Sequence, residues 1–145
     1  MTTVRIVLDT NVFVSGVLKQ KGPPGMIMDL CVRWDISLHV DDRIWHEYRA
    51  VLCRPKFRLP KEEIDRLLNA LFDLSTHVVA SPLSLDLPDQ NDAAFVEVAL
   101  AAHVDSLVTG NLRHFPKRIV GKLVLVQTPR EFLDALALGR SASYR

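Results

Sequence analysis

The sequence predicts an α/β protein with three layers, in which helices cover both faces of a central parallel sheet of five strands. Short apolar segments such as Val4–Leu8 and Ile36–Val40 alternate with longer segments whose apolar residues recur at helical spacing. Parallel strands need crossover connections, and those connections place helices on both faces of the sheet. The 145 residues suffice for one domain, and a chain that is 48% hydrophobic and 24% charged is not disordered.

The first half of the chain contains three predicted strands and three predicted helices. The β-branched segment Val4–Leu8 runs into a loop at the polar Asp9-Thr10-Asn11, and the second and third strands lie at 36–40 and 78–80. A helix follows the Pro-Gly turn, a second one ends before Pro55, and a third one follows Pro60. Asp41 or Asp42 caps the second of these helices. The apolar faces of the three helices are Ile27, Leu30, Cys31 and Trp34; Ile44, Tyr48, Val51 and Leu52; and Ile64, Leu67, Leu68, Leu71 and Phe72.

The second half of the chain begins with a predicted loop at 81–91. Asp92 then opens a helix with Phe95, Val98 and Ala99 on its apolar face, and strands are predicted at 106–108 and 123–126. The sequence Thr128-Pro129-Arg130-Glu131 is a capping box with proline at the first helical position, so it begins a last helix. The expected organisation is one domain at 1–138 with a tail at 139–145.

Composition narrows the class of protein further. The net charge is +1, from 18 Lys and Arg against 17 Asp and Glu, so the chain as a whole is neither strongly basic nor acidic. No apolar run has the ~18 residues that a membrane span needs, and no signal peptide is recognisable. We therefore expect a cytoplasmic protein without membrane contact. Cys31 and Cys53 have no metal-binding spacing, and buried thiols are expected for both.

Three carboxylates occupy positions near the predicted ends of strands: Asp9, Glu47 and Asp92. Each also has a simple structural explanation, because aspartate is a common helix cap and glutamate is common on solvated helix faces. If the three converge, two charges ~4 Å apart repel by roughly 4 kcal/mol at an effective dielectric of 20. Either one acid is then protonated, or a hard divalent cation such as Mg²⁺ or Mn²⁺ lies among them. Such a cation supports phosphodiester hydrolysis.

Several segments in a fixed order now point to a known family. They are VLDTNVF at 7–13, EY at 47–48 followed by RPKF at 54–57, two aspartates at 89 and 92, and VTGN at 108–111. Together they resemble the PIN domain family, and among its members the bacterial VapC-like proteins that are toxin components of toxin-antitoxin pairs. The resemblance implies a sheet of order 3-2-1-4-5 and a Mg²⁺- or Mn²⁺-dependent endoribonuclease that cuts single-stranded RNA.

The resemblance also assigns roles to individual residues. Asp9, Glu47 and Asp92 match the family's catalytic, metal-binding acids, and Asn111 stands where many members have a fourth, aspartate ligand. An asparagine brings an oxygen but no charge, so cleavage is expected to be weaker or to need a tighter-binding ion. Thr109 and Asn11 resemble residues that orient the acids, and Asp89 is either an outer acid or a turn residue. A cognate antitoxin and a homodimer are further implied partners.

Cations near the acids would hold the phosphates of an RNA substrate. Arg54, Lys56, Arg113 and His114 lie on predicted connectors and are the candidates, although solvated surface cations are common. Two other functions stay open. A haloacid-dehalogenase-type phosphatase needs a second acid two residues after the first, where this chain has Asn11. A PIN-like module that only binds RNA or protein is favoured by Asn111.

Overall fold

A computed structural model describes residues 3–143 of the chain. The strands are β1 (Val4–Leu8), β2 (Ile36–Val40), β3 (Ser75–His77), β4 (Ser106–Val108) and β5 (Val126–Gln127). The α-helices are α1 (Thr10–Leu18), α2 (Pro23–Val32), α3 (Asp42–Leu52), α4 (Lys61–Leu74), α5 (Ala93–Ala101), α6 (Lys117–Val120) and α7 (Pro129–Ser143). Three 3₁₀ turns connect them: η1 (Pro55–Phe57), η2 (Gln90–Asp92) and η3 (Leu112–His114).

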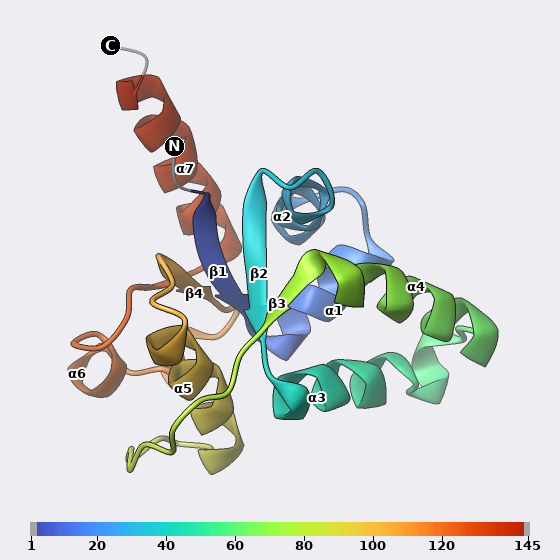
Figure 1. Cartoon of the computed structure of the whole chain (residues 1–145), viewed down its shortest axis with the longest axis horizontal. Coiled ribbons are helices and arrows are strands. Elements are labelled where there is room, and N and C mark those ends of the chain that lie inside the picture. Colours follow the sequence, from blue (N-terminus) through green and yellow to red (C-terminus); the bar gives the residue numbers. More distant parts are fainter. Residues whose placement is uncertain (1–2, 144–145) are drawn as a thin grey trace.

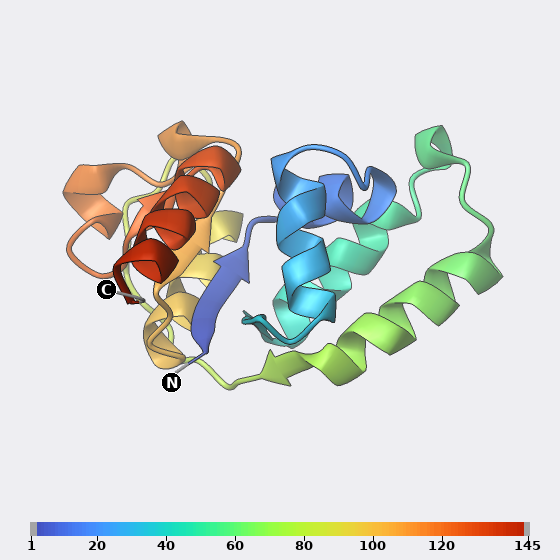
Figure 2. The same cartoon turned by 90° about the horizontal axis from the view of Figure 1, so that it is seen from above.

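The sheet has the order β3-β2-β1-β4-β5, and every neighbouring pair is parallel. Helix α5 packs against β1, β2 and β4, whereas α2 and α7 contact each other and cover β2 and the β4–β5 side (Figures 1 and 2). The predicted three-layer architecture and strand order are therefore confirmed. Because all strands point the same way, their carboxyl ends share one edge, where ligands of such sheets bind.

The core supports this edge directly. The end of β1 is fully buried, with Val7 and Leu8 at 0% and 1% exposure. The ring of Tyr48 stacks on Phe13 with centroids 3.9 Å apart, and the Tyr48 hydroxyl donates to the Leu8 carbonyl at 2.5 Å. A stacked aromatic pair adds roughly 0.5–1.5 kcal/mol beyond the burial of its area. Helix α3 is thereby fastened to the end of β1, next to Asp9.

Three predicted elements differ from the structure. Asp9-Thr10-Asn11 is not a loop, since α1 begins at Thr10, where the Asp9 side chain caps it. Strand β3 lies at 75–77 rather than 78–80, and Val79 is 98% exposed. Strand β5 starts at Val126 rather than at residue 123, because the amides of residues 123 and 124 bond back to the Val120 carbonyl at the end of α6.

Some expected core residues lie at the surface. Cys31 is buried as predicted, but Cys53 is exposed at the end of α3. Trp34 and Phe72 are 65% and 46% exposed, and Trp34 has a left-handed φ of 64° just after α2.

The expected boundary between the domain and the tail, at 138/139, lies inside helix α7, which ends at Ser143. No change of secondary structure therefore marks this boundary, and residues 144–145 lie outside the described part. None of the helices within 3–143 has the length and apolarity to cross a membrane.

Candidate active site

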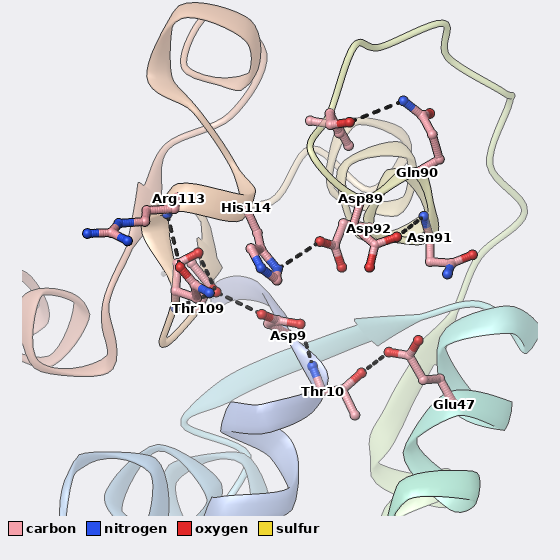
Figure 3. Close-up of polar contacts among 12 residues, drawn as sticks. Asp9, Thr10, Glu47, Asp89, Gln90, Asn91, Asp92, Thr109, Arg113 and His114 are labelled. Atoms are coloured by element: carbon pink, nitrogen blue, oxygen red, sulfur yellow. Dashed lines mark hydrogen bonds and ion pairs between the residues drawn. The ribbon is translucent and has the colours of Figure 1, made fainter.

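Residues from four elements meet at the carboxyl edge of the sheet (Figure 3). Asp9 follows β1, Glu47 lies in the second turn of α3, Asp92 ends η2 just before α5, and the η3 turn follows β4. The three acids are thus far apart in sequence but come from neighbouring elements. Each one has its own hydrogen-bond environment, which decides what it can do.

Asp9 accepts two hydrogen bonds at the carboxyl edge of the sheet. Its Oδ1 accepts from the Thr10 amide at 2.8 Å, and its Oδ2 accepts from the Thr109 hydroxyl at 2.8 Å. The residue is only 7% exposed. Burial raises the pKa of Asp9, against the lowering effects of Thr109, Thr10 and the His114 charge. The carboxylate is therefore fixed in orientation but poorly solvated.

Asp92 is the second buried carboxyl. Its Oδ2 lies 3.1 Å from Nδ1 of His114, an ion pair only when the imidazole is protonated, and this oxygen has no hydrogen bond within residues 3–143. Burial, and then the charge of Asp9, raise the pKa of Asp92 to about 6, while His114 lowers it; Asp89 and Glu47 add smaller upward effects. Asp9 and Asp92 therefore share one negative field that His114 offsets only in part.

Glu47 is half-buried and turns toward the residue after Asp9. Its Oε2 accepts a hydrogen bond from the Thr10 hydroxyl. Sequence resemblance suggested an orienting role for Asn11 and none for Thr10. Asn11 is exposed, and its side chain makes no hydrogen bond within the described residues. The assignment of Asn11 is corrected to Thr10, whose hydroxyl faces an acid that sequence spacing could not place.

Asn111 and Asp89 lie at the rim rather than among the buried acids. The Asn111 side chain is exposed and accepts from the Arg113 amide at 3.2 Å, which shapes η3. Its backbone amide donates to the Thr109 hydroxyl at 3.0 Å, and Thr109 in turn holds Asp9. Exposed Asp89 accepts from the Asn91 amide at 2.9 Å and caps η2, which favours the turn role for it.

The candidate phosphate-binding cations fall into two separate places. Arg113 and His114 lie on η3 beside the acids, as Figure 3 shows. Arg54 and Lys56 lie on the α3–α4 connection, at the far end of α3 (Figures 1 and 2). Arg54 follows Glu47 by seven residues, which is roughly 10 Å along a helix axis. The structure therefore brings the first pair to the site and not the second.

A charge network with two buried carboxylates, which was not predicted from the sequence, joins α3 to α5. Arg43 donates to Asp41 at 2.8 Å and to Glu97 at 2.7 Å, and both carboxylates are at most 7% exposed. Asp41 also caps α3 at the Ile44 amide, and Glu97 accepts from the Leu83 amide. One signal was present in the sequence, because a glutamate inside the otherwise apolar α5 implies a partner.

The acids at this edge are candidate ligands for a metal ion. Within 3–143, no group of three His, Cys, Asp or Glu side chains could hold one as arranged. Asp9 and Asp92, however, are carboxylates in one negative field, and Asp92 Oδ2 is buried without a hydrogen bond. Oxygen donors of this kind suit a hard divalent cation, which would also remove the repulsion. The donor chemistry of Asp9 and Asp92 therefore fits such an ion. Glu47 is turned toward Thr10 instead.

Comparisons with known proteins agree with this architecture. The family model described as the PIN domain matches residues 5–113. An uncharacterized protein of Methanocaldococcus jannaschii is 27% identical over 141 residues, 90% of each chain. A chain from the crystal structure of VapBC2 from Rickettsia felis, bound to a DNA fragment from their promoter, has a TM-score of 0.60 at 17% identity. That match covers 86% of this chain and 98% of the other, and it shows the fold.

The matched segment includes the three acids and the whole turn from β4 to Arg113. PIN domains are in general nucleases that use divalent metal ions. The resemblance noted in the sequence and the observed strand order agree with the family match. This chain belongs to the PIN domain family.

Proposed function

We propose that this chain is an endoribonuclease that hydrolyses phosphodiester bonds of single-stranded RNA with Mg²⁺ or Mn²⁺. The observation that supports it most is the pair of buried acids, Asp9 and Asp92, in one negative field at the carboxyl edge of the sheet that His114 offsets only in part. Two like charges in such a place destabilise the fold unless a ligand uses them. A cation that also binds a phosphate is the ligand that fits this charge.

Asp9 and Asp92 would hold the cation through their carboxylate oxygens. When bound, the ion stabilises negative charge on the phosphate and lowers the pKa of a coordinated water. Thr109 keeps Asp9 in one orientation through its hydroxyl. Glu47, which accepts from Thr10 and stays partly open to solvent, is positioned to take a proton from an attacking water.

Asn111 and the cations of η3 have separate roles in this proposal. Asn111 offers a neutral oxygen at the rim, so it can add a ligand without adding charge. Lower ligand charge reduces cation affinity, so activity should need a higher metal concentration than it would with an aspartate at this position. Arg113 and His114 lie beside the acids and are proposed to contact phosphates.

We propose further that the protein acts as the toxin of a toxin-antitoxin pair. The support is the family together with the fold shared with a chain of VapBC2. A cognate antitoxin would then cover or enter the acidic edge, and a homodimer is part of the same proposal. Co-expression with the neighbouring open reading frame, followed by copurification, tests the antitoxin directly.

The competing function is a PIN-like module that binds RNA or protein without cutting it, and the neutral Asn111 favours it. A phosphatase of the haloacid-dehalogenase type is disfavoured by the family match and by the exposed Asn11 where that chemistry needs an acid. A cleavage assay separates the first two. Partner-free protein should cut labelled single-stranded RNA with Mn²⁺ and stop with EDTA; binding without any cleavage across Mg²⁺ and Mn²⁺ concentrations would select the module.

A further inference from the structure

One long segment of this chain contains no acidic residue. Between Asp105 and Glu131 there is no Asp or Glu, although the chain has 17 of them. The same segment has five cations: Arg113, Lys117, Arg118, Lys122 and Arg130. The remainder of the chain has 13 Lys and Arg against 17 Asp and Glu, so positive charge is concentrated here. We call residues 106–130 the acid-free edge.

The acid-free edge is continuous in space as well as in sequence. It comprises β4, η3, α6 and β5, which together form the side of the molecule beyond β1 (Figure 1). All five of its Lys and Arg residues are exposed. None of them takes part in an ion pair within 3–143, whereas Arg33, Arg43 and Arg49 are each paired with a carboxylate.

This edge begins at the acids of the candidate active site. His114 lies 3.1 Å from Asp92, and Asn111 links the Arg113 amide to Thr109, which holds Asp9. In Figure 3 the Arg113 side chain points away from the acids, toward the outer side of the edge. Cations a few ångströms outside an acidic centre act within the ~10 Å screening length at 0.1 M salt. They can hold phosphates that the acids alone would repel.

We infer that the acid-free edge binds the phosphate backbone of single-stranded RNA and leads it to Asp9 and Asp92. The inference rests on the proposed function and adds the side from which the substrate is held. Phe115 is 1% exposed, so the one Phe, Tyr or Trp ring of the edge is not available for stacking on bases. Binding through exposed cations alone is independent of base sequence and strongly dependent on salt.

The second basic segment of the chain does not fit this role. Arg54 and Lys56 lie at the far end of α3, and the nearby helix α4 carries Glu62 and Glu63 in its first turn. Arg49 is already bridged to Asp65 at 2.5 Å. Positive charge there is partly compensated and is not joined to the acids. It supplies a matched comparison for the test.

The test measures RNA binding in an Asp9→Asn background, so that cleavage does not interfere. Fluorescence anisotropy of a labelled oligouridylate is recorded at several salt concentrations without metal. The variant Arg113→Gln with Lys117→Gln is compared with Arg54→Gln with Lys56→Gln, which removes the same two charges. Two lost phosphate contacts should reduce the salt slope by about 1.4 and the affinity by roughly 25-fold at 0.1 M salt. The comparison pair should change affinity less than about twofold.

A charge-preserving exchange, Arg113→Lys with Lys117→Arg, should retain the parent affinity, and thermal melting should show all three double variants folded. The inference is overturned if both neutralised pairs lose RNA affinity equally, or if the Arg54 and Lys56 pair loses more. It is also overturned if the Asp9→Asn parent does not bind RNA. Its failure is distinct from failure of the proposed function. If wild-type protein cuts RNA but the Arg113→Gln, Lys117→Gln variant binds RNA as well as its parent, only the role of the acid-free edge is refuted. If the edge binds RNA selectively but wild-type protein never cuts it, only the proposed nuclease activity is refuted.

Discussion

Replacing a proposed metal ligand should make the metal-free protein more stable. Burial and the charge of Asp9 raise the pKa of Asp92 from 3.8 to about 6, so the folded state disfavours the Asp92 carboxylate. That rise corresponds to at most roughly 3 kcal/mol of unfolding free energy. Asp92→Asn keeps the size of the side chain and removes the charge. We expect a gain of about 1–3 kcal/mol above pH 6, the lower part of the range reflecting the lost contact with His114.

The pH dependence of this gain has a definite sign. Well below pH 3.8 the Asp92 carboxyl is protonated in both the folded and the unfolded chain, so the substitution changes little. Between pH 4 and pH 6 the unfolded chain loses the proton first, and wild-type stability falls as pH rises. Above pH 6 the difference is complete. At about 3 °C per kcal/mol, the melting temperature of Asp92→Asn should exceed that of wild type by roughly 3–9 °C at pH 7.5.

The assay is thermal melting followed by circular dichroism from pH 3.5 to 8 in the presence of EDTA. Asp89→Asn is the matched control, because exposed Asp89 undergoes the same chemical change three residues away and asparagine can still accept from the Asn91 amide. Its effect should stay within about 0.5 kcal/mol. If Asp92→Asn is less stable than wild type at pH 7.5, or if its gain in stability does not change with pH, the Asp92 charge does not destabilise the metal-free fold.

Substitutions at three further residues test the site and the charge network beside it. Asp9→Asn should lower the rate of Mn²⁺-supported RNA cleavage by at least ~100-fold without destabilising the fold, because asparagine can still cap α1 and the repulsion of Asp92 is removed; an active variant would contradict the role of Asp9. Thr109→Val should cost about 1–3 kcal/mol in denaturant unfolding and Thr109→Ser much less, since Asp9 Oδ2 loses its donor; equal losses would locate the effect elsewhere. Arg43→Ala should cost about 2–3 kcal/mol, below the value for a fully buried pair because Arg43 is half exposed, and a neutral result would show that Asp41 and Glu97 do not need it.

The fold was predictable where local pattern and burial agree. Strand β1 is an uninterrupted apolar segment, and the capping box at Thr128 opens α7 with the reciprocal bonds to Glu131 at 2.9 and 3.1 Å. Strands β3 and β5 were displaced by up to three residues, because each is an edge strand of two or three residues. At an edge, partner hydrogen bonds decide where pairing begins, and these are not visible in the order of apolar residues.

The candidate site was predictable in its residues but not in its contacts. Spacing placed Asp9 and Asp92 after a strand and before a helix, and the fold brings them into one field. Glu47 faces Thr10 because Tyr48, the next residue, is fixed by stacking on Phe13, and such tertiary packing leaves no local sequence signal. The two basic segments looked alike in sequence, and only the strand order places 113–114 beside the acids while leaving 54–56 at the far end of α3.

The proposed function depends most on Asp9 and Asp92 binding one divalent cation together. Crystals of the wild-type protein soaked in Mn²⁺, at the concentration that supports RNA cleavage, test it through anomalous diffraction. We expect one strong anomalous peak in contact with oxygens of both carboxylates, and its loss in Asp92→Asn crystals. No peak at these residues, in crystals of protein that cuts RNA with Mn²⁺, would contradict it.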